Sequence, residues 1–159
     1  MKTIYPFFKW IEGTWLNKLI NDSDWLFPAI EAVHIVALAL LFGAVIVLNL
    51  RLLGVMMRGR ALPQLARELE PFTLVSLIVI LASGFLLFAA EAVKSFHSTP
   101  FRIKMALLLT AIAFHYAVSW RLMHQEEGQR PQIFSKAAAV FALALWISVG
   151  FAGRAIGFF

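Results

Sequence analysis

Four long apolar stretches are the feature of this chain that most limits how it can fold. Each is close to or above the ~20 residues that an α-helix needs to cross the hydrocarbon core of a bilayer. A segment in lipid must satisfy all of its backbone hydrogen bonds internally, and a helix does so. The sequence therefore predicts an all-α transmembrane four-helix bundle over residues 25–159, with spans at about 25–53, 71–93, 101–120 and 134–158.

The composition indicates that a membrane, rather than water, is the main solvent. Hydrophobic residues make up 61% of the chain and charged residues 14%, against about 45–50% and about 25% in soluble domains. The net charge of +5 suits contact with anionic lipid head groups. The basic residues are scattered and form no stripe, so nucleic-acid binding is not expected. Because the chain has no cysteine, disulfides, thiolate metal sites and thiol catalysis are excluded.

The first 24 residues have a different pattern. Apolar side chains recur there at helical spacing with charged side chains between them, and Pro6 can open a helix. We expect a short amphipathic helix in the membrane interface, ending at "NDSD", with a loosely ordered tail as the alternative. A signal peptide is not expected, because the segment has no continuous apolar core and no small-residue cleavage site. The apolar positions are Phe8, Ile11, Trp15 and Leu19, and the charged positions are Lys9, Glu12 and Lys18.

The segments between the apolar stretches predict loops and an orientation. Residues 56–71 and 124–132 contain glycine and proline, which favour turns. The third span has a start signal, with Thr99 as N-cap and Pro100 as the first helical residue. Lys and Arg concentrate in cytoplasmic loops, so we expect a multi-pass protein of the bacterial inner membrane with both termini outside. The basic residues near the two loops are Arg51, Arg58, Arg60, Arg67, Arg121, Arg130 and Lys136.

Several ionisable residues lie within or at the ends of the predicted spans. Each costs about 2.5–3.5 kcal/mol on insertion scales, and such residues usually face the bundle interior. Lys104 and His115 share one face of the third span, because the eleven residues between them make about three turns. The ionisable residues are Glu31 and His34 in the first span, Glu91 in the second, Lys104 and His115 in the third, and Arg154 in the fourth.

These residues suit heme b. Imidazole is a common axial ligand of heme iron, and helix bundles hold cofactors between facing helices, so we predict His34 and His115 as metal ligands. The helical rise puts the two histidines at depths that differ by ~9 Å, so whether they share one iron stays open. The predicted cofactor-binding residues form a charged outer layer: Lys104 and Arg154 for the propionates, Glu31 to orient an imidazole or balance a cation, and Glu91 at similar depth.

Other interpretations of the same residues stay open. A histidine on an apolar helix face is more often a core residue than a ligand, and the buried charges could neutralise one another as ion pairs. His97 and His124 lie at predicted helix ends, where we expect exposure to solvent. Gly150 and Gly153 in the fourth span would admit a close neighbour or a flat ligand, and small residues such as Gly84, Gly150 and Gly153 would allow a homo-oligomer.

Two segments resemble small heme-binding membrane families. The stretch "KMALLLTAIAFH", from Lys104 to His115, is similar to the lysine-to-histidine span of the HemJ-type protoporphyrinogen oxidases. The stretch "HIVALALLFGAVIVLNLRLLG", which begins at His34, is similar to the first helix of that family. Copper-resistance D-type proteins, small cytochrome b561-like proteins and uncharacterised bacterial membrane proteins share the pattern. The resemblance implies heme b binding, with His34 and Lys104 as the functional positions and His115 as a partner.

We therefore expect a heme b protein with a redox or electron-transport role, which would be an oxidoreductase if it is an enzyme. A quinone, a porphyrin or a redox protein would be its partner. Two other functions fit the same residues. Inward-facing His and Glu could handle or transport copper, or buried ion pairs could stabilise a structural membrane subunit.

Overall fold

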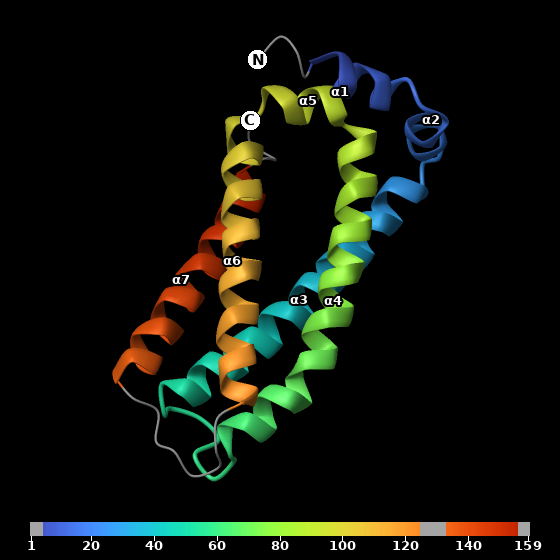
Figure 1. Cartoon of the computed structure of the whole chain (residues 1–159). Helices are drawn as coiled ribbons and strands as arrows, with labels where there is room; N and C mark the ends of the chain where they lie inside the picture. Colours follow the sequence, from blue (N-terminus) through green and yellow to red (C-terminus); the bar gives the residue numbers. More distant parts are fainter. Residues whose placement is uncertain (1–4, 125–132, 156–159) are drawn as a thin grey trace.

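The computed structural model describes residues 5–124 and 133–155, and these ranges are helical with short connections and contain no strand (Figure 1). Four of the described helices are long and apolar enough to cross a membrane. The prediction of an all-α bundle with four spans is therefore confirmed. The long helices are α3 (Leu26–Leu52), α4 (Leu62–Ala90), α6 (Thr99–Met123) and α7 (Ile133–Ala155), and the short ones are α1 (Tyr5–Glu12), α2 (Trp15–Asn21) and α5 (Ala92–His97).

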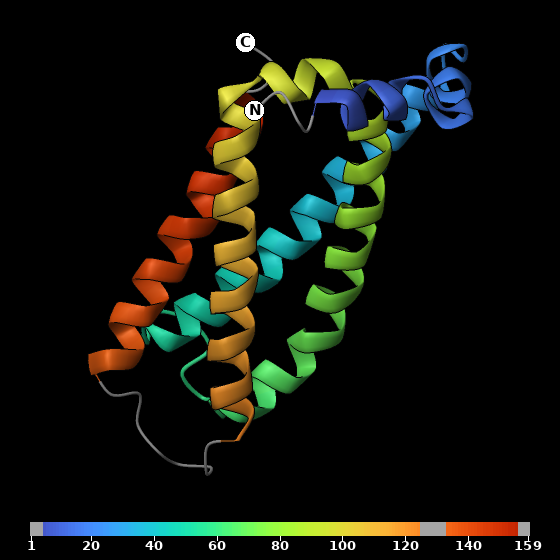
Figure 2. The same cartoon turned by 45° about the horizontal axis from the view of Figure 1, so that its top comes forward.

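The four long helices pack in a ring. Helix α3 contacts α4 and α7, while α6 contacts the same two helices from the other side, so α3 and α6 lie across the bundle from each other. The three short helices all lie at one end of the bundle, where α3 begins and α4 ends (Figures 1 and 2). At that end α5 crosses from α4 to α6. This arrangement leaves the bundle interior bounded by all four spans.

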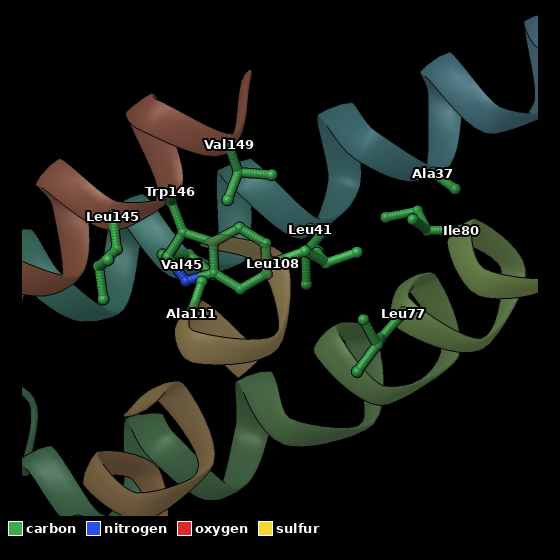
Figure 3. Close-up of a cluster of buried hydrophobic side chains, with 10 residues drawn as sticks. All are labelled: Ala37, Leu41, Val45, Leu77, Ile80, Leu108, Ala111, Leu145, Trp146 and Val149. Atoms are coloured by element: carbon green, nitrogen blue, oxygen red, sulfur yellow. The ribbon is translucent and has the colours of Figure 1, made fainter. Parts of the chain in front are cut away.

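Two clusters of buried apolar side chains hold the bundle together. The larger cluster joins all four long helices near the middle of the bundle (Figure 3). A second cluster joins the end of α3, the start of α4, the end of α6 and Ala139 of α7 at the loop end of the bundle. Many large apolar residues face outward on the same helices, as expected for surfaces that meet lipid. The larger cluster includes Leu41, Val45, Ile80, Leu108, Trp146 and Val149.

Helix boundaries differ from the predicted ones in two places. Helix α4 begins at Leu62, well before Pro71, because its first turns carry an amphipathic pattern that buries Leu65 and Ala66. Its end also falls earlier than predicted, since Glu91 leaves helical geometry and a separate helix, α5, follows. Pro71 is therefore inside α4.

The start signal of the third span is shifted by one residue. Ser98, not Thr99, caps helix α6, because its hydroxyl oxygen accepts a hydrogen bond from the Phe101 backbone N–H at 3.3 Å. His124 follows the end of this helix and is exposed, as predicted. The predicted loop at 125–132, the last residues of the fourth predicted span and the side chain of His97 lie outside the described residues.

The N-terminal segment forms two short helices instead of one. Helical geometry is interrupted at Gly13, between α1 and α2. The four predicted apolar positions therefore do not share one helix face: Ile11 is buried, while Trp15 and Leu19 are exposed. The segment is tied to α4 by Asn17, whose side-chain amide donates to the carbonyls of Ala89 and Ala90 at 2.9 Å each. These carbonyls end a helix and have no intrahelical partner, so Asn17 satisfies them.

Candidate cofactor site

A cavity of about 420 Å³ lies inside the bundle, in the half nearest α1 and α5. Its volume falls within the range of about 300–1,000 Å³ typical of small-molecule sites. All four long helices contribute to its wall, which is almost entirely apolar. His34 of α3 and Lys104 of α6 are the two lining residues with ionisable side chains. His34 and Lys104 line the same cavity because α3 and α6, which carry them, face each other across the bundle.

The imidazole of His34 is held in one orientation by α4. Its Nδ1 lies 2.8 Å from the hydroxyl oxygen of Ser83, and that hydroxyl donates its single proton to the carbonyl of Val79 at 2.6 Å. The Ser83 oxygen must therefore accept, so Nδ1 of His34 carries the hydrogen and Nε2 keeps a free lone pair. A hydrogen bond of this kind to Nδ1 is the usual companion of metal ligation through Nε2.

Gly84 makes room for that ring. A Cβ atom at this position would lie 3.3 Å from Cε1 of His34, tighter than an ordinary contact. Any side chain larger than hydrogen would therefore push the imidazole or fill the cavity. The sequence indicated Gly84 only as one of the small residues that would allow a homo-oligomer, and in the structure its neighbour is His34 of the same chain.

Lys104 brings a positive charge to the same cavity. Its side chain is half-buried and runs along Gly153 of α7, where an added Cβ would lie 3.5 Å from Cε and 3.6 Å from Nζ. The Lys104 and His34 side chains therefore line one cavity from opposite helices. Lys104 takes part in neither ion pair found within the described ranges. An apolar cavity with an uncompensated ammonium favours a ligand that carries negative charge.

His115 does not line this cavity, although it shares a helix face with Lys104. Its side chain is only 4% exposed and meets the rings of Tyr116 and Trp146 edge-on, at centroid distances of 5.5 Å and 6.3 Å. Trp146 does line the cavity, and Figure 3 shows its nitrogen turned toward Ala111 and its six-membered ring toward Leu108. His34 and His115 are thus brought to different surroundings, with Trp146 in contact with His115 on one side and with the cavity on the other.

Two buried polar atoms in this region, Nε2 of His115 and Nε1 of Trp146, have no hydrogen-bond partner among the described residues. A buried polar atom of this kind costs roughly 1–3 kcal/mol when it stays unsatisfied.

The remaining predicted site residues lie outside the cavity wall. Glu31 is exposed on the first turns of α3, and Arg154 is exposed near the end of α7. Glu91 is exposed between α4 and α5, where its carboxylate pairs with Lys94 at 3.2 Å. Their predicted roles toward a cofactor stay predictions.

Sequence reasoning did not assign a role to Ser83 or Trp146. Ser83 was one of several weakly polar span residues, and nothing in the chain alone indicates that it meets His34 of another helix. Trp146 reads as a lipid-facing aromatic residue by composition, yet only 3% of it is exposed. A signal was present for Ser83, because Ser76 and Ser83 are spaced by about two turns and both are buried.

The chain matches the model of DUF6644, described as a family of unknown function, over residues 7–159. It belongs to the DUF6644 family. No curated protein and no solved structure matches the chain. Membership of DUF6644 fits the expectation that its relatives include uncharacterised membrane proteins, and the resemblance to the named heme-binding families stays a prediction.

Within the described ranges of this DUF6644 protein, no three His, Asp or Glu side chains gather closely enough to hold a metal ion by themselves. The cavity offers one imidazole with a free nitrogen instead. Such a site can complete the coordination of a metal that brings its other ligands with it, as the iron of a porphyrin does.

Proposed function

We propose that this DUF6644 protein binds one b-type heme in the cavity and acts in electron transfer within the membrane. The single observation that carries the proposal is the His34–Ser83–Val79 hydrogen-bond chain, which leaves Nε2 of His34 unprotonated in an apolar cavity. The porphyrin supplies four nitrogen ligands, so one imidazole suffices to anchor the iron. Burial and the hydrogen bond to Nδ1 are the protein's means of tuning the iron.

Lys104 is the proposed partner of the heme propionates. Its ammonium lies in the same cavity as His34, and a carboxylate there would neutralise a charge that is otherwise costly in an apolar wall. Arg154 directly follows Gly153, beside which Lys104 runs, and is the second candidate for this role. The propionates would then point toward the bundle end that carries α1 and α5, where head groups begin.

His115 is a weaker candidate than His34 for an axial ligand of the heme iron. It does not line the cavity, and sharing one iron with His34 would require Trp146 to move. We therefore propose that His34 is the one histidine that binds the iron. We also propose that the protein lies in a bacterial inner membrane with both termini outside.

An absorption spectrum of the purified protein tests the proposal. After expression with ample heme supply, we expect a Soret band that shifts on reduction, and its absence in His34→Ala. His124→Ala is the matched control, because His124 is exposed at a helix end and should leave the band intact. A heme-free wild-type protein under these conditions contradicts the proposal, as does an unchanged band in His34→Ala.

A further inference from the structure

The wall of the cavity reaches the bundle surface on α4 and α6. Three of its lining residues are also exposed at the bundle surface: Leu81 (48%) and Phe85 (56%) on α4, and Met105 (39%) on α6. All three lie within helices long and apolar enough to span a membrane. We call the gap between Leu81, Phe85 and Met105 the portal. Because its rim is apolar and at span level, the portal faces the hydrocarbon of the bilayer.

Three aromatic rings lie over the cavity at the end that carries α1 and α5. Phe8 of α1 lines the cavity and meets the ring of Phe88 edge-on at 5.4 Å, and Phe88 stacks on Phe101 of α6 at 5.6 Å. Helix α5 crosses the same end of the bundle (Figure 2). At the opposite end the cavity ends on the packed core side chains of Leu41 and Leu108. The route from the cavity to the outside therefore leads sideways into lipid.

We propose that the redox partner of this site is a lipid-soluble quinone that meets the cofactor at the portal. The inference rests on the proposed function. Phe8, Phe88 and Phe101 lie between the cavity and the water at the α1–α5 end, whereas Leu81, Phe85 and Met105 bring the cavity wall directly to the apolar surface. A quinone diffuses in the hydrocarbon, and the exposed ring of Phe85 offers a face on which its ring can stack.

The proposed exchange balances without any other reactant. One quinol gives one electron to each of two copies of the ferric protein, which become ferrous, while the quinol becomes quinone and releases two protons to water. The reverse reaction, with two ferrous copies and one quinone, takes up the same two protons. The structure sets the place of contact, and the potentials of the two partners set the direction.

Stopped-flow reduction of the ferric, heme-loaded protein in nanodiscs by decylubiquinol tests the inference. Leu81→Trp narrows the portal and is expected to slow the appearance of the ferrous Soret band on the order of tenfold. Leu74→Trp is the matched control, because Leu74 is 46% exposed, lies on the same helix about two turns earlier and does not line the cavity. We expect this control to react at the wild-type rate. Met105→Trp, on the opposite rim, should slow the reaction as Leu81→Trp does.

The outcomes separate the two proposals. If no heme binds, the proposed function fails. If heme binds and dithionite reduces it fully, but decylubiquinol reduces wild type, Leu81→Trp and Met105→Trp at one rate, the portal has no role and this inference alone is wrong. Faster reduction of the wild type by a reduced soluble cytochrome than by decylubiquinol would also overturn it.

Discussion

The two halves of the bundle differ in whether their polar side chains have hydrogen-bond partners in the protein. In the loop half, polar side chains bond to nearby backbone: Asn49 donates to the carbonyl of Val45 at 2.8 Å, and Arg67 donates to the carbonyl of Met123 at 2.8 Å, which joins α4 to α6. In the cavity half, His34 and Lys104 line a space, and neither Nε2 of His34 nor the ammonium of Lys104 has a hydrogen-bond partner among the described residues. The loop half is therefore built for packing, and the cavity half is available for a ligand.

The largest expected effect is on packing in the loop half. Leu52, at the end of α3, is fully buried in the second cluster. Leu52→Ala removes contacts that nothing replaces and should lower the free energy of unfolding by about 2–4 kcal/mol. Leu38→Ala, in the wall of the existing cavity, should cost clearly less, because that side chain is only partly packed. Unfolding in mixed micelles with rising dodecyl sulfate measures the free energy of unfolding of both variants. Equal losses of unfolding free energy in Leu52→Ala and Leu38→Ala would contradict the proposed difference between the two halves.

The next largest effect is on ligand binding in the cavity half. Gly84→Leu would place a side chain in the space of the His34 ring. We expect heme affinity to fall about a hundredfold or more, roughly 2.8 kcal/mol, with unfolding nearly unchanged. Gly43→Leu is the control, since a Cβ there meets nothing within 4 Å. Similar heme titrations for the two variants would show that Gly84 does not shape the site.

A smaller effect is expected from the charge of Lys104. Lys104→Met removes the proposed propionate partner but leaves His34 in place, so heme should still bind with affinity reduced about tenfold, roughly 1.4 kcal/mol. Lys104→Arg should restore most of the loss, because it restores the charge. Heme titrations of the two variants and of Lys94→Met, an exposed control, measure this. Equal affinity for Lys104→Met and wild type would remove Lys104 from the site.

The smallest effect concerns the N-terminal segment. Asn17→Ala deletes both hydrogen bonds to the carbonyls of Ala89 and Ala90. We expect a local cost of about 1 kcal/mol, seen as faster amide hydrogen exchange in α1 and α2 without a change in the four spans. Asn21→Ala, which loses one bond of 3.2 Å to Ala90, should have a weaker effect. Unchanged exchange in both variants would mean that the segment is held by its apolar contacts instead.

The sequence alone sufficed to predict the four spans, because the length of an apolar segment decides whether it can cross the bilayer, and this length can be counted in the sequence. It also brought His34 and Lys104 to one interior, since both lie on inward helix faces. It could not foresee that Glu31, Glu91 and Arg154 would reach the surface, because helix inclination near the bundle end decides this. The hydrogen bond of Ser83 to His34 depends on how α4 pairs with α3, and the start of α4 at Leu62 depends on packing against the second cluster.

The two histidines offer the most direct test of the central claim. Heme-free protein in detergent is titrated with hemin in parallel for wild type, His34→Ala and His115→Ala, and the Soret band gives the number of hemes bound per chain. The account predicts one heme in wild type and in His115→Ala, and none in His34→Ala. Loss of heme in His115→Ala with retention in His34→Ala would contradict it.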